Sequence, residues 1–363
     1  MPPLLLLLRI AGSIALFVIA LAQADPLRAA DTRHRLAIAS WNLEWLADPA
    51  VLLAADFWRV CKSRGWPNEK PRADLPFCDV YRSHGIETAA DYAKRKLTPL
   101  RQGLAALAAR QMDILAVQEV QRPSALAAVL PTGYRIVCFT TRGDAQNIGF
   151  AVRIALAISA TCREIIPLSL ERDPEVPRPV RRGLELTLPV NGATVSVLNV
   201  HLKSGCSHGR MDNAANDACM FLQHQAAPLE EWIEAQANAH RAFVIVGDWN
   251  RDLEEELAGH YPARTDGSDP AGPIVPAHVR NLFPEINDGV PPASTMTVSA
   301  VDRSAADDGA CRKVLDQLVV SDRFKTMLEP SSLAGGRVRA RLVRGPDGAS
   351  DHCALEVVIR MKQ

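Results

Sequence analysis

The chain lacks a net charge of either sign, because its 363 residues include 41 Lys and Arg and 41 Asp and Glu. A uniformly basic surface, which would attract a polyanion from a distance, is therefore excluded. Any anionic substrate must be held by local cations or by a bound metal ion. The sequence also lacks internal repeats, low-complexity tracts and an evident linker between domains. Its 48% hydrophobic content suffices for one large domain or two small ones, and the missing linker favours one.

Only one long apolar run is present, and it lies at the N-terminus. Residues 4–24 are about long enough to span a bilayer, but they end in Ala22-Gln23-Ala24, which is typical of a signal cleavage site. We predict a signal peptide over residues 1–24, with an uncleaved anchor as the alternative. Its removal takes away Arg9 and leaves 40 basic against 41 acidic residues, a formal charge of −1. No cysteine lies near the run, which excludes a lipid-modified N-terminal cysteine.

All eight cysteines follow this segment. An even number in an exported chain favours disulfides, although sequence alone cannot give the connectivity. Spacing suggests the pairs Cys61–Cys78, Cys138–Cys162, Cys206–Cys219 and Cys311–Cys353. A zinc site from His201, Cys206, His208 and Cys219 is the alternative, but its spacing matches no usual ligand pattern.

Many short apolar runs and few helical patterns make up the rest of the chain. Strands are expected at 35–46, 112–120, 134–140, 148–158, 183–190, 194–204, 244–248, 313–321 and 353–361. Helical spacing appears at 97–111 and 221–240. Insertions are expected near 51–96, 204–222 and 254–310, the last of them mostly loop. This pattern predicts an α/β fold in which two sheets pack together with helices outside.

Polar residues stand at the ends of five of these strands: Asn42 with Glu44, Glu119, His201 with Lys203, Asp248 with Asn250, and Asp351 with His352. A sixth strand carries Asp316 inside the apolar run "VLDQLVV". Each has an ordinary structural interpretation when taken alone, such as a turn, a surface strand end or a satisfied buried histidine. Buried carboxylates are costly unless they are paired or bound to metal, so six such strands together indicate one shared site.

In this order, the segments "WNLEW", "AVQEV", "NVHLKS", "VGDWN", "LDQLVVS" and "SDHCAL" resemble the endonuclease/exonuclease/phosphatase superfamily, the group of deoxyribonuclease I and exonuclease III. The resemblance spans about residues 36–360. It implies a four-layer α/β sandwich of two packed mixed β-sheets flanked by helices, formed by one catalytic domain over residues 25–363. It also implies metal-dependent hydrolysis of phosphate esters. The loop "KSGCSHGRMDNAANDAC" is longer than expected for the family, which leaves the choice of substrate open.

The resemblance implies a role for each matching residue. Glu119 would be the principal metal-binding carboxylate, Asn42 and Glu44 would hold the metal directly or through water, and Asp351 would be a further acid on the metal side. His201 would contact the scissile phosphate, which Asp248 and Asn250 would flank. Asp316 would orient His352. Arg178 resembles a phosphate-contacting Arg-x-Pro segment, and Lys203 is expected as a local cation beside it.

These residues also suit the chemistry of a phosphodiester. A hard cation such as Mg²⁺, or alternatively Mn²⁺ or Ca²⁺, would neutralise the phosphate and polarise its oxygen. Asp316 would fix the tautomer of His352 and raise its basicity, while Asp248 is a competing candidate for the general base. Sequence does not separate the two bases, one-metal from two-metal mechanisms, or endonuclease from exonuclease action.

We therefore predict a secreted or periplasmic, monomeric nuclease acting on DNA, with RNA as a further substrate. A lipid phosphodiesterase or phosphatase of the same superfamily is the first alternative. No apolar hairpin for membrane insertion stands out, although Phe57, Trp58 and Trp66 form a small aromatic cluster, and no stable membrane association is expected after signal cleavage. A catalytically inactive binding or toxin-type subunit is the second alternative, disfavoured because every expected catalytic position holds a competent residue.

Overall fold

The computed structural model describes residues 34–52, 57–58, 78–142, 145–157, 159–212, 216–258, 281–289, 291–302, 311 and 314–362. The signal peptide predicted for residues 1–24 and Cys61 of the predicted Cys61–Cys78 pair lie outside the described residues. Residues 31–363 cluster as one compact unit. Among the described helices, none is both long and apolar enough to cross a membrane.

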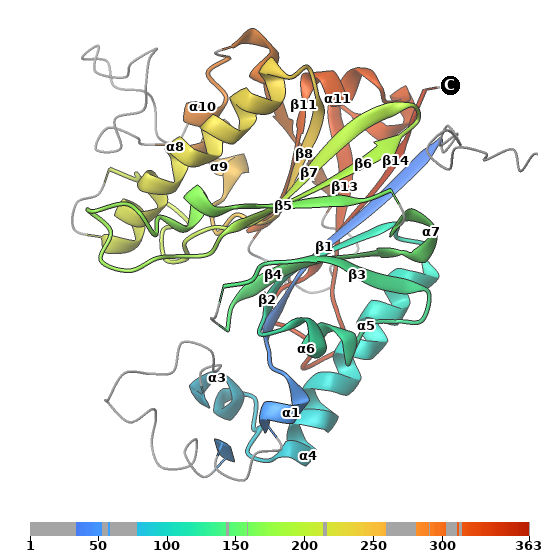
Figure 1. The fold of residues 1–363 in the computed structure, drawn as a ribbon, viewed down its shortest axis with the longest axis vertical. Helices are drawn as coiled ribbons and strands as arrows, with labels where there is room; N and C mark the ends of the chain where they lie inside the picture. The colour runs from blue at the N-terminus through green and yellow to red at the C-terminus, as the bar shows by residue number, and fades with distance from the viewer. Residues whose placement is uncertain are drawn as a thin grey trace, which may run out of the picture. The chain divides into compact units, whose positions relative to one another are not determined.

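Two mixed β-sheets form the centre of this unit (Figure 1). The first has the strand order β10-β13-β14-β1-β2-β4-β3, with β12 paired to β13. Its strands are β1 Arg35–Leu46, β2 Ile114–Val120, β3 Tyr134–Phe139, β4 Asn147–Arg153, β10 Ala300–Asp302, β12 Leu333–Ala334, β13 Arg337–Val343 and β14 Ala354–Arg360. The second has the order β5-β6-β7-β8-β11-β9. Its strands are β5 Thr161–Ile165, β6 Gly183–Val190, β7 Ala193–His201, β8 Ala242–Asp248, β9 Met296–Val298 and β11 Asp316–Ser321.

Helices cover the outer faces of both sheets. Figure 1 draws α8 (Asp217–Asn238) along the second sheet and α5 (Thr98–Ala109) along the first. The remaining helices are short: α1 Pro49–Leu52, α3 Cys78–Ser83, α4 Ala89–Tyr92, the π-helix η2 Ala93–Leu97, α6 Pro123–Ala127, α7 Ile154–Ala157, α9 Leu253–Leu257, α10 Leu282–Ile286, α11 Asp322–Thr326 and the 3₁₀ turns η3 Ile166–Ser169, η5 Pro292–Ser294 and η7 Pro330–Ser332. The predicted four-layer α/β sandwich is thus confirmed by the described residues.

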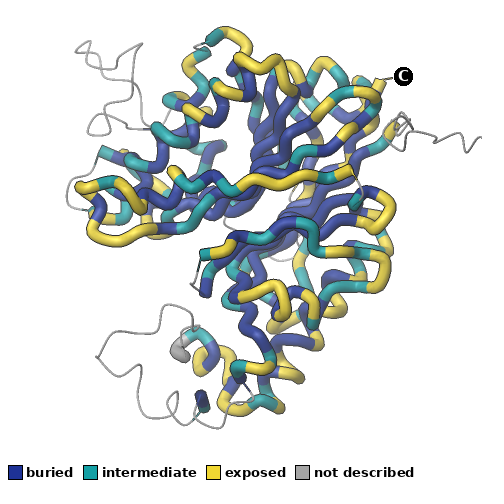
Figure 2. The backbone as a smooth tube through the Cα atoms, viewed as in Figure 1, coloured by how far each residue is buried: buried dark blue, intermediate teal, exposed yellow. Residues whose placement is uncertain are grey.

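Alternate residues of each central strand enter different apolar cores. In β8, Val244 and Val246 face the core between the sheets, while Phe243 and Ile245 pack with Trp232 of α8. β1 divides in the same way between the inner core and the core under α5. Both faces of these strands are covered, which explains why they read as continuous apolar runs. Figure 2 shows these strands as buried along nearly their whole length.

Three of the predicted disulfides are present: Cys138–Cys162, Cys206–Cys219 and Cys311–Cys353. The first joins β3 to β5, one strand from each sheet. Because Cys206 and Cys219 bond to each other, their alternative role as zinc ligands is wrong.

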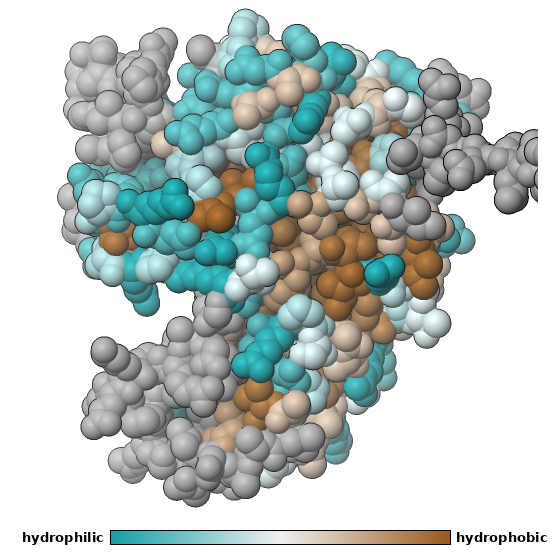
Figure 3. All heavy atoms as spheres, in the orientation of Figure 1, coloured by the Kyte–Doolittle hydropathy of each residue, from teal (hydrophilic) through white to brown (hydrophobic). Residues whose placement is uncertain are grey.

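The secondary structure departs from the prediction at several places. The apolar run 148–158, predicted as one strand, ends as strand β4 at Arg153 and continues as helix α7. Ile154 of α7 is 56% exposed, and Figure 3 shows apolar atoms gathered in this area of the surface. Strand β13 was not predicted, because its sequence "RVRARLV" alternates arginine with apolar residues and has only one buried face.

Candidate active site

The site forms where strand ends from both sheets meet. In the second sheet, Asp248 at the end of β8 lies opposite His201 of parallel β7 and opposite Asp316 of antiparallel β11. In the first sheet, Asn42 of β1 lies opposite Gln118 of parallel β2, one residue before Glu119. Register alone therefore brings these polar side chains to one edge of the sandwich, the arrangement expected from the sequence.

The glycine before Asp248 allows this close packing of strands. Gly247 has φ +137°, and a Cβ added there would lie 2.1 Å from the backbone oxygen of Val200. No other residue fits this position without moving β7, so the "GD" pair of the sequence has a steric origin.

Asp316 and His352 form a close pair. Oδ2 of Asp316 lies 2.6 Å from Nδ1 of His352. The turn that carries the histidine is fixed to β1, because the Trp41 indole donates to the His352 carbonyl at 3.0 Å and the Ser350 hydroxyl donates to the Asn42 carbonyl at 2.6 Å. Oδ1 of Asp316 is buried and has no hydrogen-bond partner among the described residues.

The charges of this pair favour a protonated imidazole. Burial opposes the charged form of His352, but Asp316, Asp248 and Asp351 outweigh it and raise its pKa well above the ordinary value. Burial raises the pKa of Asp316, and the neighbouring His352 counteracts part of that rise. Nε2 of His352 remains on the open side of the pair, 3.9 Å from Oδ2 of Asp248.

Asp248 is held by two amide donors. Nδ2 of Asn42 donates to its Oδ2 at 3.0 Å, and the backbone N–H of Asn250 donates to its Oδ1 at 2.9 Å. Asn250 is in turn fixed by its Nδ2, which donates to the Leu202 carbonyl at 3.1 Å. Burial raises the pKa of Asp248 to about 6, with His352 opposing and Asp316 adding to this rise.

His201 is buried between two carboxylates. Its Nε2 lies 3.5 Å from Oδ2 of Asp248 and 3.6 Å from Oε1 of Glu119. Burial, followed by the nearby charges of Arg181, His352 and Lys203, lowers its pKa well below the ordinary value. At neutral pH this histidine is therefore an uncharged hydrogen-bond donor, not a cation.

Glu119 is held at the end of β2 with a left-handed φ of 57°. The backbone N–H of Trp45 donates to its Oε2 at 3.1 Å, and Nε2 of Gln146 donates to its Oε1 at 3.0 Å. Burial raises the pKa of Glu119 to about 6, against the lowering effect of Arg181. Backbone conformations of this kind cost about 1–3 kcal/mol and concentrate at functional sites.

Glu44 has different surroundings. Nζ of the buried Lys96 lies 2.8 Å from its Oε2, and Nε2 of His84 lies 2.7 Å from its Oε1. Lys96 also donates to the Ala349 carbonyl at 2.8 Å, so it joins the Glu44 turn to the loop before His352. Sequence reasoning missed Lys96, which is the last of three consecutive basic residues and sits on the π-helix η2. Such helices are rare and are often found at functional sites.

Three cations lie on the other side of the site. Arg181 donates to the carbonyls of His201 and Leu202 and to Oε1 of Gln146. Burial and the charges of Arg181 and Arg178 lower the pKa of Lys203. Arg178 itself is exposed. Arg181 and Gln146 were missed by sequence reasoning, since both lie in segments between strands that no pattern assigns to the site.

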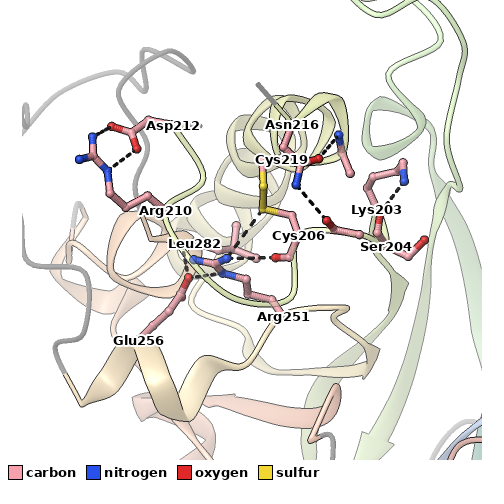
Figure 4. The surroundings of a disulfide bond; sticks show 12 residues. Lys203, Ser204, Cys206, Arg210, Asp212, Asn216, Cys219, Arg251, Glu256 and Leu282 are labelled. Carbon is pink, nitrogen blue, oxygen red and sulfur yellow. Dashed lines mark hydrogen bonds and ion pairs between the residues drawn. A yellow bond between two sulfur atoms is a disulfide. The ribbon is translucent and has the colours of Figure 1, made fainter. Parts of the chain in front are cut away.

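The loop after Lys203 is anchored beneath the site. Figure 4 shows the Cys206–Cys219 disulfide beside Arg251, whose guanidinium donates to the Cys206 carbonyl at 3.0 Å and to Oε1 of Glu256 at 2.5 Å. Both Arg251 and Glu256 are buried. Because Arg251 follows Asn250 directly, one rigid segment connects the strand end to this loop.

The residues predicted to hold a metal are only partly assembled. Glu119 and Asn42 lie at the strand ends, Asp351 is exposed with Oδ1 3.9 Å from Nε2 of His352, and Glu44 is engaged by Lys96. Among the described residues, one group of three possible metal ligands has its ligand atoms within 4.8 Å of one another. This group consists of His208, Asp252 and Glu255 and lies outside the candidate active site. The predicted donors are nevertheless carboxylate and amide oxygens, the types that Mg²⁺ and Ca²⁺ prefer.

No family model and no curated protein matches the chain. One similar solved structure is that of TDP2 from C. elegans, which is 15% identical in sequence and has a TM-score of 0.45. The alignment covers 90% of this chain and 75% of the TDP2 chain. An endonuclease/exonuclease/phosphatase family protein from Leptotrichia buccalis has 10% identity, 90% and 100% coverage and a TM-score of 0.46. A protein of the same description from Beutenbergia cavernae has 14% identity, 91% and 72% coverage and a TM-score of 0.44.

Proposed function

We propose that the chain is an exported, divalent-metal-dependent phosphodiesterase that hydrolyses nucleic acid. The observation that carries this proposal is the convergence of the buried Asp248 and Asp316 and the half-buried Glu119 with two histidines where the two sheets meet. A structural role gives no reason to gather five such groups at one edge, since each is costly to bury.

The donor set suits a hard cation. Glu119, Asp351 and the side-chain oxygen of Asn42 would hold it, with Glu44 contributing only through water because Lys96 and His84 engage both its oxygens. When bound, the metal ion would supply charge neutralisation at the phosphate and polarisation of its oxygen.

The remaining residues would bind and orient the substrate. Lys203, Arg181 and Arg178 form a local basic area for the phosphate, which the net charge of the chain alone would not attract. The amide groups of Asn42 and Asn250 and the uncharged His201 would donate hydrogen bonds to the developing charge. Asp316 would hold the ring of His352. Because His352 is protonated, the proton of the attacking water would pass to Oδ2 of Asp248, and Nε2 of His352, 3.9 Å away, would donate to the phosphate.

Two features support an exported location: the N-terminal apolar run with its Ala22-Gln23-Ala24 ending, and the three disulfides. Mass spectrometry of the protein recovered after export should give an N-terminus at Asp25. A chain that retains Met1 would show that the segment stays in place.

The proposed activity can be tested with the exported protein on two substrates, plasmid DNA and a lipid phosphodiester, each with Mg²⁺ and with chelator. We expect cleavage of DNA with Mg²⁺, no cleavage with chelator, and no hydrolysis of the lipid. Glu119→Gln is the matched control, since it keeps the side-chain shape and removes the charge. Cleavage of the lipid alone would overturn the nucleic-acid assignment, and undiminished cleavage in chelator would overturn the metal.

A further inference from the structure

A polar pocket lies at the end of the second sheet opposite the candidate active site. Its volume is about 620 Å³, and it is lined by Gly192, Ala193, Thr194, Ala239, His240, Arg241, Ala242, Arg323, Thr326 and Met327. Ala242 begins the strand β8 that ends at Asp248. Six residue steps of about 3.3 Å put the pocket roughly 20 Å from the candidate active site, so it is a separate feature.

The lining contains cations and no acid. Arg241 and Arg323 are both exposed, and neither has a hydrogen bond or ion pair from its side chain among the described residues. The acid next to Arg323 in sequence, Asp322, pairs instead with Lys325 at 2.9 Å. Lys362 adds a third cation at the rim, because its Nζ donates to the Thr326 carbonyl at 2.7 Å.

Three separate backbone features create the pocket. The turn at Asn191 and Gly192, with φ of 48° and 77°, joins β6 to β7. His240, the residue after the C-cap of α8, has a left-handed φ of 52°, where glycine is usual. The backbone N–H of Arg241 then bonds the Gln236 carbonyl at 3.0 Å, which fixes the direction in which the chain leaves the helix.

The charge balance of the pocket favours an anion. The C-terminal end of α8 contributes about half a negative charge at most. Two guanidinium groups outweigh it, and guanidinium binds phosphate oxygens by paired, charge-assisted hydrogen bonds. Thr194, Thr326 and His240 offer further polar groups around them.

We propose that this pocket is an accessory binding site for a dianionic phosphate group, free or carried as a phosphate monoester. Two arginines match two negative charges on one phosphate, whereas each phosphodiester of a nucleic-acid backbone carries one. The volume exceeds that of phosphate alone, which leaves room for a carrier group. This site does not depend on the proposed catalytic function.

Calorimetric titration of the exported, disulfide-intact protein in chelator tests the proposal, with inorganic phosphate and thymidine monophosphate as two probes. We expect both to bind, with Arg241→Gln/Arg323→Gln weakening the affinity by at least about tenfold. The matched control is Arg135→Gln/Arg172→Gln, which removes two exposed arginines elsewhere and should change the affinity less than about twofold. Thermal unfolding of each variant verifies that it is folded.

The two probes separate the sources of the phosphate. Tighter binding of thymidine monophosphate than of inorganic phosphate would assign the site to a monoester, and equal binding would assign it to the free ion. Thymidine without phosphate should not bind. The proposal is overturned if neither probe binds, if both double variants lose affinity equally, or if the Arg241→Gln/Arg323→Gln protein binds as tightly as the parent.

Discussion

Two groups of acids in this molecule, all of them wholly or largely buried, differ in their counter-charges. Away from the candidate site, Asp113, Glu185, Glu256 and Glu356 each form an ion pair with at least one arginine. At the site, Glu119, Asp248 and Asp316 form no ion pair with Lys or Arg among the described residues. The first group is neutralised permanently within the fold, whereas the second depends on histidine, amide donors or a bound cation.

The pKa of Glu185, from the first group, and the pKa values of Glu119 and Asp248, from the second, shift in opposite directions. Burial would raise the pKa of Glu185, but hydrogen bonds from Arg163 and other donors outweigh it and leave the pKa lowered. Burial dominates at Glu119 and Asp248 and raises each pKa to about 6. Glu44, which Lys96 neutralises, belongs with the structural acids even though it lies beside the site.

The largest expected effect comes from removing the histidine that balances Asp248 and Asp316. His352→Ala should reduce phosphodiester hydrolysis by several orders of magnitude, and Asp316→Asn by somewhat less, because Asp316 acts through His352. The double variant should be scarcely slower than His352→Ala. Hydrolysis rates of the three proteins test this, and losses that multiply would show that the two residues act independently.

Among the structural acids, Glu256 should matter most to stability. Glu256→Gln leaves Arg251 buried without its counter-charge and weakens the bonds to the backbone N–H groups of Leu282 and Phe283. We expect a loss of about 3–5 kcal/mol in the free energy of unfolding. Denaturant unfolding measures it, with Glu255→Gln as a control expected to cost less than about 1 kcal/mol, since that side chain is partly exposed. Equal losses would contradict the comparison.

Neutralising Glu119 and Glu44 should change stability in opposite directions in chelator. The folded protein binds the Glu119 proton more tightly than the unfolded chain does. The protein therefore loses stability as pH rises from 4.5 to about 6 and Glu119 ionises. Glu119→Gln should therefore raise stability by about 2 kcal/mol at pH 8 and have little effect at pH 4. Glu44→Gln should lower stability, because Lys96 loses its partner. Tm values at the two pH values measure both, and destabilisation by Glu119→Gln at pH 8 would refute the assignment.

The smallest effect is expected at Glu230, an acid outside the site whose pKa burial raises to about 7, assisted by Asp288, Glu234 and Glu285. Here the neighbours are other acids of α8 and of the segment 285–288, and Glu230 is partly exposed, so solvent screens the effect. Glu230→Gln should stabilise the protein by less than about 1 kcal/mol at pH 8 and leave it unchanged at pH 4.5. A pH-independent change in Tm would show that lost contacts, not charge, are responsible.

More of the strand-end residues at the candidate site could be predicted from the sequence than of the residues that surround them. Asp248, His201 and Asp316 were predictable because each is a polar residue in or directly at the end of an apolar run. The register between the neighbouring strands then places the three residues opposite one another. The positions of Lys96, Gln146 and Arg181 depend on how segments between strands fold back, which no local period encodes. Glu44 and its partner Lys96 are 52 residues apart in the sequence. The sequence therefore showed an acid near the candidate site but not its counter-charge.

For the fold, the predicted elements were those whose strands are covered on both faces. Strand β13 was not predicted because its arginines occupy one face. Strands β9 and β10 were not predicted because each is only three residues long. Helix α7 continues the composition of β4 without a break, so apolar content alone could not locate the change at Ile154.

The central claim is that the acids at the candidate site lack a permanent counter-charge because they bind a metal ion. The most direct test measures whether a divalent cation stabilises the folded protein. Thermal unfolding of the parent protein, Glu119→Gln and Glu185→Gln should be compared with Mg²⁺ or Mn²⁺ and with chelator. We expect the metal to raise the Tm of the parent and of Glu185→Gln, since a ligand of the native state stabilises it, and to leave Glu119→Gln unchanged. An equal rise in Glu119→Gln, or no rise in the parent protein at millimolar metal, would contradict the account.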